Sequence, residues 1–125
     1  MTWTLDLPDG EYLTPNSRAH WAKRQRCARA WREATAWLAR AERIPRLDRV
    51  NVQLVMIPKD RRRRDEDNLT LVQKWCIDGL VDAAVVPDDA PQHVRAEMPR
   101  IWTPDVELEA HRWVLYVEQE AADAA

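Results

Sequence analysis

The alternation of hydrophobic and polar residues divides the chain into short elements. Residues 2–7 (TWTLDL) alternate and predict a strand, and residues 49–57 (RVNVQLVMI), rich in β-branched side chains, predict a second. Residues 93–101 and 106–118 predict two further strands. In the last of these, the residues predicted to share one face are Trp113, Leu115 and Val117.

Two helices are predicted between these strands. The first follows an N-cap at Asn16 or Ser17 and runs to about residue 43, where Pro45 ends it. The second starts near Asn68 and runs to about Ala84. The apolar stripes at helical spacing are Ala28, Trp31, Thr35, Leu38 and Ala41 in the first helix, and Leu69, Val72, Cys76, Leu80 and Ala83 in the second.

The element order β-α-β-α-β-β predicts an α+β fold, with a small mixed β-sheet packed against two main helices. A chain of 125 residues corresponds to one domain, so we expect a single domain over residues 1–119 and a flexible tail over 120–125. No apolar run approaches the ~20 residues that cross a bilayer, so we expect no membrane contact. Two cysteines, Cys27 and Cys76, exclude a disulfide scaffold or a zinc ribbon and favour the cytoplasm.

The small net charge of -2 hides a strong asymmetry between the two halves. Residues 1–64 hold 15 Lys/Arg against 7 Asp/Glu, whereas residues 65–125 hold 4 against 14. The basic half ends in four consecutive arginines, Arg61–Arg64, which repel one another unless a polyanion binds there. Such a division is typical of a protein with a basic face for a polyanion and an acidic cluster for a metal. Two solvated faces are the alternative.

Two closely spaced aspartates directly follow the arginines. Asp65 and Asp67 are two residues apart, which points both carboxylates the same way on an extended segment. Close carboxylates repel unless a cation lies between them or one is protonated, and oxygen ligands favour Mg²⁺ or Mn²⁺ over zinc. Asp89, in the turn after the second helix, offers a third carboxylate. The alternative is that Asp67 or Asn68 only caps the helix and that Asp88 and Asp89 only form a turn.

Basic groups for phosphate beside carboxylates for a metal are what a nuclease needs. At this point the chain resembles the RusA family of Holliday junction resolvases, especially its phage-type members, over roughly residues 5–117. The strings that carry the resemblance are RRRRDEDN at 61–68, Lys74 ahead of Ile77-Asp78-Gly79-Leu80, and Val86-Pro87-Asp88-Asp89. The stretch TPNSRAHW at 14–21 is similar to the Asn-containing loop that leads into a basic helix in that family.

The resemblance implies a homodimeric, Mg²⁺-dependent endonuclease that nicks four-way DNA junctions in symmetric pairs, with Mn²⁺ as a possible substitute. It implies metal binding and catalysis by Asp65, Asp67 and Asp89, with Lys74 as the catalytic lysine. In the better-known form this lysine lies four residues after the second aspartate, whereas Lys74 lies seven after Asp67. Both offsets keep the same helical face. The residues expected to contact DNA are Arg61, Arg62, Arg63, Arg64, Asn16, Arg18, Lys23 and Arg24.

The predicted helix raises a geometric problem for this site. A helix from Asn68 to Ala84 would be about 25 Å long, and the five residues from there to Asp89 span at most about 17 Å. One hypothesis is a composite site, in which antiparallel second helices of two subunits place Asp89 of one near Asp65 and Asp67 of the other. Off the inward stripe, the residues that could form this contact are Leu71 and Trp75. The alternative is a shorter or bent helix with all ligands from one chain.

Two other functions compete with a nuclease that acts in the cytoplasm of a bacterium or a phage-infected host. The first is a protein that binds junction or duplex DNA without cutting it, which the displaced Lys74 would favour. The second is a helical interaction module whose acidic residues are only caps, and it predicts no affinity for DNA at low salt.

Overall fold

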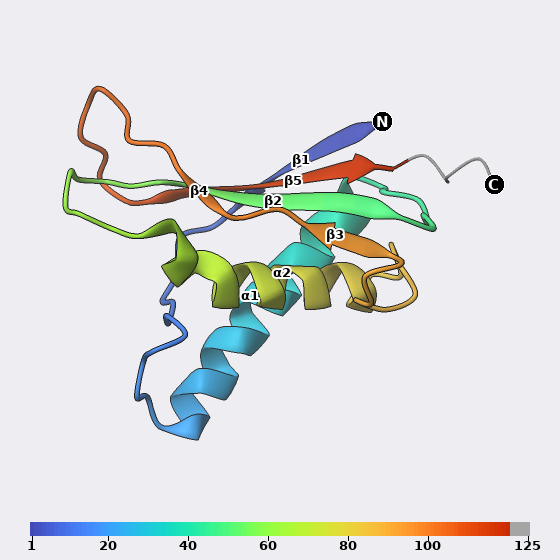
Figure 1. Cartoon of the computed structure of the whole chain (residues 1–125), viewed down its shortest axis with the longest axis horizontal. Coiled ribbons are helices and arrows are strands. Elements are labelled where there is room, and N and C mark those ends of the chain that lie inside the picture. Colours follow the sequence, from blue (N-terminus) through green and yellow to red (C-terminus); the bar gives the residue numbers. More distant parts are fainter. Residues whose placement is uncertain (121–125) are drawn as a thin grey trace.

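A five-stranded mixed β-sheet carries both long helices on one of its faces (Figure 1). The computed structural model describes residues 1–120 and confirms the predicted α+β class. Its elements are β1 (Thr2–Leu7), α1 (Trp21–Ala41), β2 (Val50–Ile57), the 3-10 helix η1 (Glu66–Leu69), α2 (Thr70–Asp82), β3 (Val94–Ala96), β4 (Arg100–Ile101) and β5 (Arg112–Gln119). Within residues 1–120, no helix combines the length and the apolar character needed to cross a membrane.

The last strand in the sequence lies at the centre of the sheet. β5 is antiparallel to both β1 and β2, while β3 and β4 pair in parallel with β2. The single strand predicted over 93–101 is wrong, because residues 97–99 leave the ladder between β3 and β4. In this interruption, the carbonyls of Glu97 and Met98 accept side-chain hydrogen bonds from Gln73 and Gln53 instead of strand hydrogen bonds.

The core lies between the sheet and the helices. The three residues predicted to share a face of β5, Trp113, Leu115 and Val117, are all buried there. β2 buries alternate residues against the same core. Glu120, the first residue of the predicted tail, donates its backbone N–H to the carbonyl of Arg49 over 3.1 Å. The rest of that predicted tail, 121–125, lies outside the described residues.

The first helix begins later than the sequence predicts. His20 is the N-cap of α1, and its Nδ1 accepts a hydrogen bond from the N–H of Ala22 over 3.1 Å. The predicted caps are wrong because Ser17 closes a local turn with Thr14 through backbone and side-chain hydrogen bonds. Serine side chains compete in this way with helix formation for nearby backbone groups. Asn16 is left exposed ahead of the helix.

The second helix is shorter than predicted and crosses α1 at very close range. α2 ends at Asp82, and its predicted first turn is the 3-10 helix η1. At the crossing, a Cβ on Gly79 would lie 2.6 Å from the carbonyl oxygen of Arg32 and 2.7 Å from Cβ of Thr35. Only a glycine fits there without moving a helix. Beyond the crossing, Arg32 forms an ion pair with Asp82 over 2.8 Å.

Candidate metal and phosphate site

The two predicted metal ligands of the acidic pair lie at the entrance to the second helix. Asp65 has an extended backbone at the end of the loop after β2, and Asp67 belongs to the first turn of η1. Both are exposed. Within residues 1–120, neither carboxylate accepts a hydrogen bond or forms an ion pair, and Asp65 does not cap η1 with its side chain. The capping alternative therefore does not explain these two carboxylates.

Hydrogen bonds and a buried side chain hold the backbone around Asp65 and Asp67 in place. Oε2 of Glu66 accepts a hydrogen bond from the N–H of Ile101 in β4 over 2.8 Å. Leu69 is buried, and the hydroxyl of Thr70 donates to the carbonyl of Asp67 over 2.9 Å. Glu66 was not predicted as a site residue, and its side chain links η1 to the sheet. Asp65 and Asp67 are thus exposed groups on a fixed support.

The four arginines before the pair do not have equivalent positions. Arg64 is turned into its own loop, where its Nη2 lies 2.8 Å from Oδ1 of Asp60 and its side chain is only 14% exposed. This hydrogen bond is the main reason that the pKa of Asp60 lies below its usual value. Arg62 and Arg63 are exposed, and no hydrogen bond or ion pair involves their guanidinium groups within the described chain. Arg61 makes a long contact of 3.4 Å to the carbonyl of Asp105.

The predicted catalytic lysine is held by two carboxylates. Nζ of Lys74 lies 2.8 Å from Oδ1 of Asp78, one turn along the helix, and 2.7 Å from Oδ2 of Asp89. The hydrogen bonds that Lys74 donates to Asp78 and Asp89 raise the pKa of Lys74, and the Lys74 ammonium lowers the pKa of Asp89. Asp78 was not predicted as a partner of Lys74, although a lysine and an aspartate four residues apart on a helix are close enough to form an ion pair.

The position of Asp89 corrects the geometric estimate from the sequence. That estimate placed Asp89 beyond the end of the second helix, but the chain turns back at Ala84, which has a positive φ of 60°. Val85 donates its N–H to the carbonyl of Leu80 and is buried, and these contacts direct the following residues along α2. Asp89 therefore lies beside Lys74 within a single subunit.

The three predicted metal ligands still do not meet within one subunit. Among residues 1–120, no group of three or more His, Cys, Asp or Glu side chains is arranged to hold a metal ion. The pair Asp65 and Asp67 alone suits Mg²⁺, which in phosphate-transfer sites is bound by one or two carboxylates together with water and substrate phosphate. Asp89 requires either a rearrangement or a second subunit to join them.

A buried glutamine that the sequence did not single out positions the residues around Lys74. Gln73 is 4% exposed, and its Oε1 accepts a hydrogen bond from the N–H of Leu54 in β2 over 2.7 Å. Its Nε2 donates to the carbonyl of Glu97 over 2.8 Å. An open hollow of about 270 Å³ lies beside Gln73 and Lys74, between α2 and residues 96–99. Gln73 thus fixes the helix face from which Lys74 projects.

The N-terminal residues predicted to bind DNA form a separate basic region. Asn16 and Arg18 are exposed ahead of α1, and Arg24 is exposed on its second turn. Lys23 forms an ion pair with Glu11 over 2.9 Å, which partly neutralises it. In Figure 1 this end of α1 lies at the bottom of the molecule, well away from the loop of residues 58–65 at the left.

Trp75, which was predicted to contact a second subunit, is instead buried within its own subunit. Trp75 is 7% exposed because α2 packs against both α1 and the sheet, which bury most of its circumference. Leu71 is half-buried against the same core.

A scan against protein-family models found no match to this chain, and a search of curated proteins found none either.

Proposed function

We propose that this protein is a Mg²⁺-dependent endonuclease of the RusA type, which resolves four-way DNA junctions by paired symmetric nicks. One observation carries the proposal. Asp65 and Asp67 are exposed, free of partners in the described chain and held on a fixed support directly beside exposed arginines. Two exposed carboxylates two residues apart repel each other unless a cation binds between them, and carboxylate oxygens are ligands that suit Mg²⁺.

Each group has a role in this proposal. Asp65 and Asp67 hold Mg²⁺, or Mn²⁺ in its place, and the cation supplies Lewis-acid activation of the scissile phosphate and of the attacking water. Lys74 offers a positively charged amine that stabilises negative charge as it develops on the phosphate. Arg61, Arg62 and Arg63 bind the DNA backbone, which gives affinity without reading the base sequence.

We further propose that the enzyme acts as a homodimer in the cytoplasm. A twofold dimer matches the twofold symmetry of a four-way junction and provides two active sites for two nicks. In such a dimer, Asp89 reaches Asp65 and Asp67 either from the partner subunit or by leaving Lys74 within its own subunit. Mixing Asp65→Asn subunits with Asp89→Asn subunits separates these routes, because only a shared site restores part of the activity in the mixture.

The direct test is cleavage of a synthetic four-way junction with and without Mg²⁺. We expect paired nicks that need the metal, and we expect Asp67→Asn to abolish cutting while junction binding in EDTA is retained. Asp105→Asn is a matched control, because Asp105 is an exposed aspartate in a different loop. Retained cutting by Asp67→Asn would contradict the proposed metal site. If the wild type bound the junction tightly but did not cut it with any divalent metal, the protein would bind junctions without cleaving them.

A further inference from the structure

An exposed tryptophan begins the first helix. Trp21 is 69% exposed, and its nearest aromatic neighbour is the ring of His20, with ring centroids 5.7 Å apart. Tryptophan is enriched at binding interfaces, because its indole combines a large apolar face with a polar N–H. Two surface hollows adjoin this side chain.

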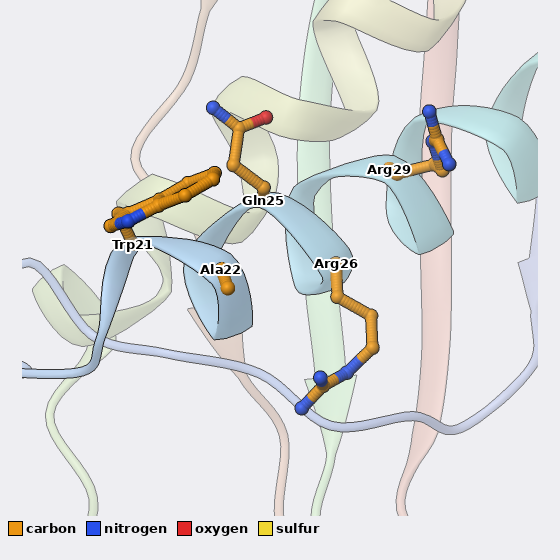
Figure 2. A pocket seen from close by; sticks show the side chains of 5 residues that line it. All are labelled: Trp21, Ala22, Gln25, Arg26 and Arg29. Carbon is orange, nitrogen blue, oxygen red and sulfur yellow. The ribbon is translucent and has the colours of Figure 1, made fainter.

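The first hollow has a volume of about 300 Å³, which lies at the lower end of the range for small-ligand sites. It is lined by Trp21, Ala22, Gln25, Arg26 and Arg29 (Figure 2). The second hollow has a volume of about 210 Å³ and is lined by Trp21, Arg24, Gln25, Ala28 and Trp75. Neither lining includes an acidic residue. The indole of Trp21 and the amide of Gln25 are thus common to both hollows.

The arginines around Trp21 are only weakly neutralised. The guanidinium of Arg24 has no hydrogen bond or ion pair within residues 1–120. Arg26 and Arg29 make only long ion pairs, of 3.9 Å to Glu11 and 3.8 Å to Glu33. In Figure 2, Gln25 extends beside the indole, while Arg26 extends to the other side of the helix. A flat exposed aromatic ring near guanidinium groups that are unpaired or only weakly paired complements an unpaired base and its flanking phosphates.

We propose that this end of α1 binds a single strand of DNA, with one unpaired base stacked on Trp21 and neighbouring phosphates on Arg24, Arg26 and Arg29. Duplex DNA keeps its bases stacked on one another, so only an unpaired base can offer its face to the indole. The choice of DNA over RNA rests on the proposed function, whose substrate is DNA. The strand-binding surface itself is separate from Asp65 and Asp67.

The test measures the affinity for a fluorescein-labelled oligo-dT by fluorescence anisotropy, in EDTA and at low salt. A strand of about 12 nucleotides lies within the ~4–16 that single-strand sites cover. We expect Trp21→Ala to weaken binding by about 5- to 100-fold, the usual effect of losing one stacking platform. Trp21→Phe retains a ring and should lose much less. Both variants should keep the melting temperature, because Trp21 is exposed.

Trp37 provides a matched control on the same helix. It is 67% exposed, so it matches Trp21 in chemistry and exposure. The sixteen positions between them place it about 24 Å along the helix and roughly 160° around its axis. We expect Trp37→Ala to leave the affinity unchanged. Arg24→Ala and Arg29→Ala should each reduce the salt dependence of binding, by about 0.7 in the slope of log K against log salt.

Several results would overturn the inference. Trp21→Ala could bind the single strand as tightly as the wild type does, or it could lose as much affinity for a hairpin duplex as for the single strand. The wild type could also bind the matching RNA strand more tightly than the DNA strand. A lower sedimentation mass of DNA-free Trp21→Ala would show instead that this face covers a second copy of the chain. The binding assay contains EDTA and requires no cutting, so single-strand binding can be found even if the junction is not cleaved. Junction cleavage can likewise be found even if single-strand binding is not. The two proposals therefore fail separately.

Discussion

Nζ of Lys74 lies 2.7 Å from Oδ2 of Asp89, although the two residues are 15 positions apart in the sequence. The turn at Ala84 brings them together, and Asp78 holds the same amine from within α2. A lysine is normally charged at neutral pH, and the hydrogen bonds to both carboxylates raise the pKa of Lys74 further. A charged lysine is suited to stabilising a phosphate and cannot act as a base.

Replacing this lysine should separate activity from stability. We expect Lys74→Met to lower junction cleavage by about 100-fold or more, the usual effect of removing a group that stabilises transition-state charge. The free energy of unfolding should change by about 1 kcal/mol or less, since Lys74 is exposed and exposed ion pairs contribute little. Single-turnover cleavage and urea unfolding measure the two effects. Lys59→Met is the matched control, and equal losses in both variants would contradict the assigned role.

The arginine loop should divide into binding and structural residues. We expect Arg62→Ala and Arg63→Ala each to reduce the salt slope of duplex binding by about 0.9, without a change in melting temperature. Arg64→Ala should instead destabilise the protein by about 1–2 kcal/mol, because it removes hydrogen bonds of a mostly buried guanidinium to Asp60 and its loop. Salt titrations of binding and thermal unfolding check both expectations. An Arg64 variant with normal stability and a reduced salt slope would reverse this assignment.

The crossing of the helices should make Gly79 intolerant of a side chain. Alanine normally stabilises a helix relative to glycine by about 1 kcal/mol. At Gly79 we expect the opposite, a loss of about 1–3 kcal/mol, because the added methyl would overlap Arg32 and Thr35. Gly10→Ala is the control, since a Cβ there meets nothing within 4 Å. Urea unfolding of the two variants gives the comparison, and a stabilised Gly79→Ala protein would show that the helices separate easily.

The stability should fall in mild acid because of His111. Its Nδ1 accepts a hydrogen bond from the N–H of Lys59 over 3.0 Å, so protonation of this nitrogen breaks the bond. Burial lowers the pKa of His111 in the folded state. The stabilisation is therefore complete above the unfolded value of about 6.5 and is lost as the pH falls through the lower folded value. The expected loss is that of one hydrogen bond, about 1 kcal/mol.

Urea unfolding between neutral pH and pH about 5 measures this effect, which His111→Gln should reduce. His93 is the control, because its Nδ1 faces the carbonyl oxygen of Asp48 and must carry a proton to bond to it. An unchanged pH profile in His111→Gln would show that another group causes the loss.

The pattern of the chain predicted the elements of the fold better than their ends. Alternation located β1, β2 and the buried face of β5, because a strand with one face in the core must alternate. It misplaced the start of α1, where a turn at Ser17 competes with the cap. It also joined β3 to β4, since side-chain hydrogen bonds from Gln73 and Gln53 to the intervening carbonyls have no signature in a hydrophobic pattern.

The candidate site was predictable in its residue types and less so in their positions. The spacing of Asp65 and Asp67 after four arginines indicated free carboxylates beside basic groups. It could not show that Arg64 turns inward, because the four side chains are chemically identical and only the loop distinguishes them. The return of Asp89 to Lys74 depends on a positive φ at Ala84, a conformation that alanine seldom adopts and that sequence therefore does not signal.

The tight contact at Gly79 also bears on how the two ends of the molecule act together. Since a Cβ on Gly79 would lie 2.6 Å from the carbonyl oxygen of Arg32, α1 and α2 are in close contact there, and this contact limits how far one helix can slide against the other. Trp21 is the first residue of α1, and Asp65 and Asp67 lie just before α2. The contact between the helices therefore helps to hold the distance from Trp21 to the two aspartates. If one DNA strand bound both Trp21 and the two aspartates, the cut would fall at a set distance from the base stacked on Trp21, whatever the sequence of the substrate.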